Sequence, residues 1–338
     1  MAVPSSPFAF ALCQPGSEKF LKAEMKRLRP DLHPAMQRPG LVSFKATAEP
    51  FDVSRPPRAV FARAWSASAG PAHSAREIVD LARALGVAAA WVSPRDQGPP
   101  EEVPPALLAA AEADAARLRD ELSRQGVGSE APAGKLVLDV ITAPGERPVV
   151  GWHMHTEGAP GAGGRWDYAV PSEAPSRAYR KVVESLRFTG ARLSPGDLVL
   201  EIGAAPGGGT LAFVERGARV LAVDPRPLDA AVLARPGVSQ TQATIGDVQE
   251  LPPDVRWVAC DAGIPPADVL AALGRLRPQL RGVAGLFWTL KLVHESDAAN
   301  LQRTLARLGE IGFRSPLAAQ LPAHRRDLLV YARGPRGA

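Results

Sequence analysis

The sequence is short of lysine, of cysteine and of long apolar runs. Only seven of its forty basic residues are lysine, and Lys181 and Lys291 are the only two after Lys135. Cys13 and Cys260 are the only cysteines and lie in opposite halves of the chain, so a disulfide framework is not expected. No run approaches the roughly twenty apolar residues that span a bilayer, and the N-terminus lacks the features of a secretory signal. We therefore expect a cytoplasmic, reduced protein.

The scarcity of lysine makes the two late lysines informative. Elsewhere in this half positive charge is carried by arginine, which cannot release its proton at working pH, whereas a crowded lysine can. Lys291 ends the run Leu286–Leu290, which is too apolar to need a lysine for solubility. It is therefore a candidate for proton-transfer chemistry, and the alternative is a surface charge at the end of a strand.

Length and composition allow two globular domains. The chain has 338 residues, of which 46% are hydrophobic and 22% charged. Its formal charge of +5 favours an anionic partner such as nucleic acid, but only weakly over this length.

A glycine- and proline-rich stretch at 158–164 divides the chain into two patterns. Before it, short strands and helices are mixed, with one helix expected after a Ser74 cap and another opening at 99–102. This mixture predicts an α+β region with more than one small sheet. After it, strands and helices alternate regularly, which predicts right-handed βαβ units and a parallel sheet covered on both faces. We therefore expect an α+β region over 1–157, a linker over 158–174 and an α/β domain over 175–338.

The last two expected strands, 317–321 and 328–331, are joined by only six residues. Such a connection is too short for a crossover helix and predicts an antiparallel hairpin. A terminal hairpin is typical of methyltransferase sheets and foreign to most dehydrogenases.

The stretch from Gly203 to Thr210 is a glycine-rich turn between an apolar strand and a helix. Nucleotide-like ligands meet unpaired backbone N–H groups at such turns. Asp224 ends the next strand about twenty residues on, where a carboxylate can accept ribose hydroxyls. A ligand-free turn and a helix-capping aspartate are the alternatives. These features alone do not separate NAD from S-adenosylmethionine, although the loop lacks the G-x-G-x-x-G spacing of dinucleotide folds.

Other polar residues are expected near the same edge of the sheet. Asp261 follows the apolar run Arg256–Cys260 and should face the ligand crevice. Asp247 follows a further expected strand and either bonds an adenine amino group or lies on a surface loop. His153 and His155 share one face of a strand, but no third ligand has suitable spacing, so no metal site is expected.

These motifs together resemble the FtsJ-like ribose 2′-O-methyltransferases. The residues that carry the resemblance are Ser176–Lys181, the Gly203–Gly208 loop, Asp224, Cys260–Asp261 and Leu290–Leu292. More narrowly, the chain is similar to the RlmM family, which methylates a cytidine 2′-OH of bacterial large-subunit (23S) ribosomal RNA. Segments 12–19, 61–65 and 147–150 are similar to that family's N-terminal region, which carries a THUMP RNA-binding domain. The resemblance therefore covers most of the chain.

The resemblance implies S-adenosylmethionine as cofactor, RNA as partner and a Rossmann-like methyltransferase sheet. The family's Lys-Asp-Lys-Glu tetrad falls on Lys181, Asp261, Lys291 and Asp327, with aspartate in place of the usual glutamate. Lys291, its pKa lowered by Lys181 and by burial, would be the general base. Asp261 would orient Lys291, and Asp327 would hold Lys181. The cofactor contacts that carry over are Ala178, Gly203, Ala205, Pro206, Gly207, Gly208, Asp224, Asp247 and Asp261.

The chain also departs from the family pattern. Gly209 stands where the family often has tryptophan, Ala205 where RlmM has cysteine, and Val293–Glu295 where the family has a basic segment. Two functions from other classes remain open at this stage: a catalytically silent RNA-binding protein of ribosome assembly, and an NAD-linked oxidoreductase.

Overall fold

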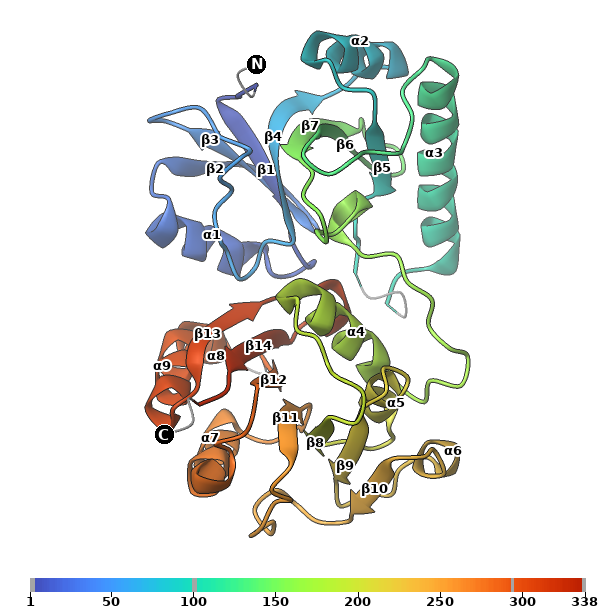
Figure 1. Cartoon of the computed structure of the whole chain (residues 1–338). Coiled ribbons are helices and arrows are strands. Elements are labelled where there is room, and N and C mark those ends of the chain that lie inside the picture. Colours follow the sequence, from blue (N-terminus) through green and yellow to red (C-terminus); the bar gives the residue numbers. More distant parts are fainter. Residues whose placement is uncertain (1–3, 99–101, 293–294, 336–338) are drawn as a thin grey trace. The chain divides into compact units, whose positions relative to one another are not determined.

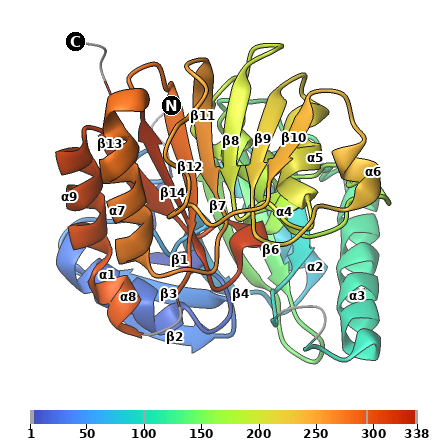
Figure 2. The ribbon, with the colours of Figure 1, turned by 90° about the horizontal axis from the view of Figure 1, so that it is seen from below.

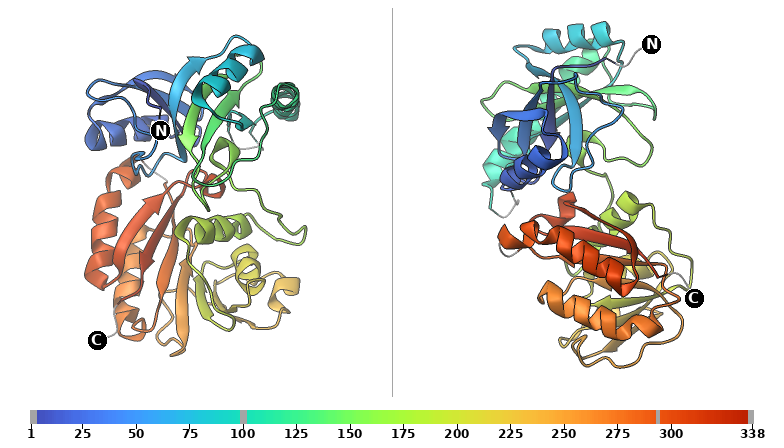
Figure 3. Two further views of the ribbon diagram at one scale, coloured as in Figure 1. Left: turned by 45° about the horizontal axis from the view of Figure 1, so that its top comes forward. Right: turned by 90° about the vertical axis from the view of Figure 1, so that its left-hand side faces the viewer.

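The computed structural model describes residues 4–98, 102–292 and 295–335 and divides the chain into two compact units. The first unit covers Met1–Asp167 and the second Tyr168–Ala338, so the division falls inside the stretch expected to be a linker. Figures 1 and 3 show each unit as one sheet with its own helices. The expected helix start at 99–101 and most of the departure at 293–295 lie outside the described residues.

The first unit is built on a single seven-stranded sheet in the order β2-β3-β1-β4-β7-β6-β5. Its strands are β1 (Phe8–Leu12), β2 (Leu32–Arg38), β3 (Leu41–Ala46), β4 (Ala64–Pro71), β5 (Ala90–Pro94), β6 (Leu136–Thr142) and β7 (Val149–Met154). Its helices are α1 (Glu18–Leu28), α2 (Ala75–Leu85), α3 (Pro105–Arg124) and the 3-10 turn η1 (Ala162–Gly164).

The expectation of more than one small sheet in this unit was wrong. β4 pairs with β1 on one side and with β7 on the other, and so joins the two halves of the region into one sheet. The helix expected at Ser74 is confirmed: the Ser74 hydroxyl accepts the Glu77 N–H, and Gly86 ends α2 with a φ of 65°.

The second unit has the expected parallel sheet, in the order β10-β9-β8-β11-β12-β14-β13. Its strands are β8 (Leu198–Ile202), β9 (Arg219–Val223), β10 (Val238–Thr241), β11 (Val255–Cys260), β12 (Gly285–Leu290), β13 (Arg314–Ala319) and β14 (Leu328–Arg333). Its helices are α4 (Ala178–Thr189), α5 (Gly208–Val214), α6 (Ala230–Leu233), α7 (Pro266–Leu276), η2 (Arg277–Gln279), α8 (Glu295–Ala299), α9 (Leu301–Ile311) and η3 (Pro322–His324).

The strand directions confirm the hairpin at the end of the chain. β10, β9, β8, β11 and β12 run parallel, whereas β14 is antiparallel to both β12 and β13. Figure 2 shows α4 and α5 on the opposite face of this sheet from α7 and α9. Every residue of β8 and β12 is buried, as a central strand covered on both faces requires.

The stretch after Asp167 is not a free linker. Tyr168, Val170 and Ala174 pack against a buried cluster of the second unit that includes Tyr179 and Leu211. Residues 168–174 therefore belong structurally to the second unit.

Both cysteines are free and buried, and burial raises the pKa of each thiol to about 12. Among the described residues no helix is both long and apolar enough to cross a bilayer.

Candidate active site

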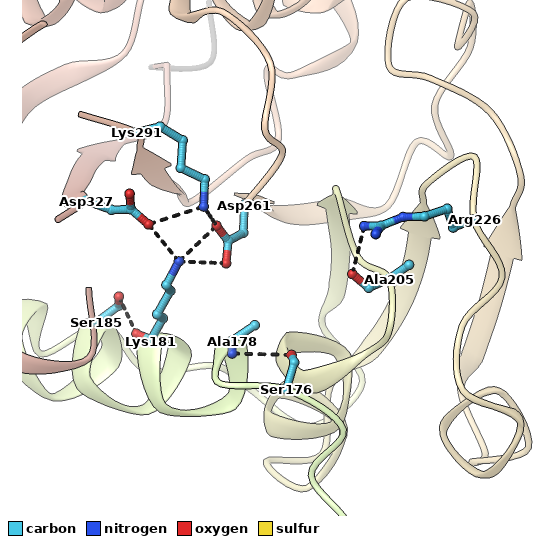
Figure 4. Close-up of polar contacts among 9 residues, drawn as sticks. All are labelled: Ser176, Ala178, Lys181, Ser185, Ala205, Arg226, Asp261, Lys291 and Asp327. Atoms are coloured by element: carbon cyan, nitrogen blue, oxygen red, sulfur yellow. Dashed lines mark hydrogen bonds and ion pairs between the residues drawn. The ribbon is translucent and has the colours of Figure 1, made fainter. Parts of the chain in front are cut away.

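Four charged side chains meet at the carboxyl-terminal edge of the second sheet. Lys181 lies on the first turn of α4, Asp261 follows β11, Lys291 follows β12, and Asp327 precedes β14. Leu290 at the end of β12 pairs with Leu328 at the start of β14. The antiparallel register therefore brings Lys291 close to Asp327. Figure 4 shows the four side chains pointing toward one another.

The four groups form a closed set of ion pairs. The Lys181 Nζ donates to both oxygens of Asp261 at 3.1 Å and to the Asp327 Oδ2 at 3.0 Å. The Lys291 Nζ donates to the Asp261 Oδ1 at 2.6 Å and to the Asp327 Oδ2 at 3.2 Å. The side chains are between 14% and 28% exposed. Two cations are thus balanced by two carboxylates in a partly desolvated site that keeps an opening to solvent.

The pKa of Lys291 differs from the sequence-based expectation. Burial does act to lower it, but the charge and hydrogen bond of Asp261, and then those of Asp327, outweigh burial, so the pKa lies above its ordinary value. The expected depression was wrong for this arrangement because both carboxylates contact the ammonium directly. Without further positive charge nearby, Lys291 is an ammonium at neutral pH.

A cavity of about 410 Å³ adjoins the tetrad and shares Lys181, Asp261 and Lys291 with it. This size is within the range of small-molecule sites. Five of the residues expected to contact a cofactor without belonging to the tetrad line it: Ala178, Gly203, Ala205, Pro206 and Asp224. Apolar side chains also line it, among them Ile202, Val223, Ile245 and Ile264.

Glycine is required at Gly203 for close packing beneath the cavity. Its φ is 75°, and a Cβ there would lie 2.6 Å from the backbone of Ala262. Gly207 and Gly208 are not among the residues that line the cavity. Their missing side chains instead make room for Val232 and Ser176 respectively.

Asp224 lines the cavity and also holds the loop. Its side chain is 4% exposed. Its Oδ2 accepts the Ala205 N–H at 3.0 Å and its Oδ1 accepts the Arg226 N–H at 2.9 Å. Figure 4 shows the Arg226 guanidinium reaching back to the Ala205 carbonyl. Asp224 does not act as a helix cap, since α6 is capped by Asp229.

Asp247 lies on an exposed turn, and its carboxylate accepts the N–H and the hydroxyl of Thr244 at 3.1 and 2.6 Å. Thr244 and Ile245 line the cavity, but Asp247 is not among the lining residues. In the described structure it shapes the rim.

Glu201, which was not predicted as a site residue from the sequence, lies beneath the tetrad. It is 4% exposed, and its Oε2 accepts the Thr210 hydroxyl at 2.5 Å. Burial, opposed by the Thr210 hydrogen bond and aided by the charges of Asp261 and Asp224, raises its pKa to about 8. The available signal was a single charged residue inside the apolar strand Leu198–Ile202.

Of the two histidines expected on one face of a strand, His153 is held by a carboxylate. The His153 Nδ1 lies 2.6 Å from the Asp139 Oδ2, which also accepts the Ser66 hydroxyl. Within the described part of the chain no group of three His, Cys, Asp or Glu residues is placed to hold a metal ion.

No family model matches the chain. The ribosomal RNA large subunit methyltransferase M of Halorhodospira halophila is 30% identical to this chain over an alignment 338 residues long, gaps included. The alignment covers 95% of each chain. The protein of the same name from Cellvibrio japonicus is 32% identical over 168 residues, about 47% of each chain. Among solved structures, TrmN from Thermus thermophilus spans 97% of this chain and 99% of its own at 16% identity, with a TM-score of only 0.38.

Proposed function

The chain belongs to the ribosomal RNA large subunit methyltransferase M family, and from this premise we propose that it methylates a ribose 2′-hydroxyl of large-subunit ribosomal RNA. The substrate we infer is a cytidine of the 23S RNA, as the resemblance of its motifs implies. The observation that carries the proposal is the pair of lysines bridged by Asp261 and Asp327 beside the cavity. Methylation of a weakly acidic hydroxyl needs a proton acceptor next to the methyl donor, and this pair supplies one.

The cavity fits S-adenosylmethionine. Its apolar wall suits a flat base, the Asp224 carboxylate suits ribose hydroxyls, and its far side opens on the tetrad. S-adenosylmethionine supplies a methyl group on a sulfonium, whose sulfur leaves as a neutral thioether. Ala178, Gly203, Ala205 and Pro206 would hold the amino-acid part, and Asp247 would act near the adenine through the Thr244 turn.

In this proposal the tetrad aligns the ribose 2′-hydroxyl and accepts its proton. Lys291 accepts that proton as the oxygen–methyl bond forms, Asp261 orients Lys291, and Asp327 holds Lys181. Lys291 must first become neutral. Lys291 lines the cavity, so its pKa would be lowered by a sulfonium cation bound there, against the raising effect of the two carboxylates.

We also propose that residues 1–157 form the RNA-holding, THUMP-like part of the protein. This part of the chain has no excess of cations over anions. The first unit carries 19 basic and 19 acidic residues, whereas the second carries 21 and 16, so the entire formal charge of +5 lies in the second unit. Recognition by the first unit must therefore use particular contacts rather than net charge.

The test is methylation, by the purified protein with labelled S-adenosylmethionine, of the organism's 23S RNA taken from a deletion strain, in which the target hydroxyl is unmodified. We expect label at one cytidine that resists alkaline cleavage on its 3′ side, because a 2′-O-methyl blocks that cleavage. Label on a base would reject ribose methylation. RNA binding with no transfer would favour the catalytically silent alternative, and a missing 2′-O-methyl in a deletion strain would identify the nucleotide.

A further inference from the structure

The position of the Asp327 carboxylate depends on its backbone. A single oxygen, Oδ2, meets both lysines, at 3.0 and 3.2 Å. Aspartate has one methylene fewer than the glutamate usual at this position, so little side-chain freedom remains to correct a displaced backbone. Whatever fixes the segment before β14 therefore fixes the tetrad.

That segment has an unusual conformation. Arg325 has a φ of 52° and a ψ of −111°, a region that residues with a Cβ rarely adopt. Two hydrogen bonds stabilise the turn: the Asp327 N–H donates to the His324 carbonyl at 2.8 Å, and the Gln320 amide donates to the Arg325 carbonyl at 2.8 Å. Gln320 and His324 are each 2% exposed. A residue in such a conformation persists only where the surrounding structure holds it, so the contacts of the buried segment before the turn determine its position.

Glu184 provides that anchor. It is 4% exposed, its Oε2 accepts the Ala323 N–H of η3 at 2.8 Å, and its Oε1 accepts the Tyr168 hydroxyl at 2.9 Å. Glu184 follows Lys181 by three residues on α4, so the two side chains lie on one face of the helix. One helix thus carries a lysine of the tetrad and also holds the turn that presents Asp327.

We propose that Glu184 is a positioning residue for methyl transfer. It does not touch the reacting groups; it fixes η3 so that the short Asp327 side chain reaches both lysines. This inference rests on the proposed function, since it concerns the same tetrad. Tyr168, the first residue of the second unit, belongs to the same arrangement because it orients the Glu184 carboxylate.

The test compares Glu184→Gln with Glu215→Gln in the full-length protein. Glu215, the residue that ends α5, also accepts a tyrosine hydroxyl, that of Tyr179 at 2.7 Å, but it is not a contact of η3. An amide at 184 cannot accept both donors. We expect kcat to fall on the order of tenfold to a hundredfold, the scale of a small misplacement of catalytic groups. The KM values for both substrates should change little, and Glu215→Gln should keep wild-type kcat.

The pH profile separates positioning from general destabilisation. Asp327 helps to raise the pKa of Lys291, so a displaced Asp327 should move the rising limb of kcat against pH to lower pH in Glu184→Gln. If Glu184→Gln does not fold, Tyr168→Phe decides: it keeps the Ala323 bond, and we expect a smaller loss of kcat with a shift of the same sign.

Equal kcat and unchanged pH profiles in the 184, 168 and 215 variants would overturn the inference while leaving the proposed function intact. Absence of ribose methylation by the wild-type protein would instead reject the proposed function.

Discussion

Lys181 and Asp261 form a bidentate ion pair, with both carboxylate oxygens 3.1 Å from one ammonium, although the two residues are 80 positions apart. The pair joins α4 to the end of β11, on neighbouring walls of the cavity. Both oxygens of Asp261 accept hydrogen bonds from Lys181, and these two bonds orient the carboxylate. The 2.6 Å hydrogen bond from the Lys291 Nζ to the Asp261 Oδ1 is then a third bond to the same carboxylate. Lys291 is therefore the tetrad lysine with the fewer fixed contacts.

Lys291→Arg tests whether Lys291 is the general base. Arginine keeps the positive charge but cannot serve as a base, so methyl transfer should be abolished while the affinity for S-adenosylmethionine stays within a few-fold. Only the neutral amine can accept a proton, so the base fraction grows with pH, and kcat should rise as pH increases through the pKa that Lys291 has with its substrates bound. Wild-type turnover in the arginine variant would exclude Lys291 as the base.

Glu201→Gln tests the buried carboxyl beneath the tetrad. With a folded pKa of about 8 against an ordinary 4.5, the folded protein holds a proton that the unfolded chain has released. The stability that this proton contributes is fully present below about pH 4.5 and is lost as pH rises to about 8. Glutamine carries no such proton, so the stability of the variant relative to wild type should increase over this window, by at most about 1.4 kcal/mol per pH unit.

Chemical denaturation of both proteins at pH 5 and pH 8 measures this difference. A constant difference between them at the two pH values would show that Glu201 is ionised in the folded state at neutral pH. The exposed substitution Glu49→Gln is a suitable control for general charge effects.

The sequence predicted most of the second unit because its elements are locally encoded. The apolar run of β12 and the alternation with helices needed no knowledge of tertiary contacts. The strand expected before Asp247 is β10, but its bounds could not be predicted because Val238–Thr241 is a short edge strand whose residues alternate between partly buried and exposed. β2 was missed because it contains a proline and is mostly exposed.

Properties that depend on distances between remote residues could not be predicted in the same way. The single sheet of the first unit follows from the two pairings of β4, which no local pattern encodes. The tetrad members could be named from their motifs, but the direction of the Lys291 pKa depends on two carboxylates within 3.2 Å of its ammonium. The anchoring bond from Ala323 to Glu184 spans 139 positions and has no sequence signature.

Asp224→Ala tests the orientation of the cofactor. Removing the carboxylate should weaken S-adenosylmethionine binding by on the order of 1.5–3 kcal/mol for each charge-assisted hydrogen bond lost. The substitution also frees the Ala205 and Arg226 N–H groups, so part of the loss reflects a loosened loop. Asp224→Asn keeps one acceptor oxygen. In calorimetric titrations its affinity for S-adenosylmethionine should lie between those of the wild type and Asp224→Ala. Unchanged affinity in both variants would reject this orientation.

A chain shortened to begin at Gly164 tests the division of labour between the two units. It keeps Tyr168 with its bond to Glu184 and the complete second sheet, so it should still bind S-adenosylmethionine. It should methylate RNA poorly at sub-saturating concentration, because holding the substrate supplies much of the rate in a two-substrate reaction.

RNA binding by the full chain should weaken steeply with salt as phosphate contacts are lost. Filter binding across a salt series, with methylation assays on the same ribosomal RNA, measures both effects. Equal activity of the two chains would place the recognition surface in the second unit.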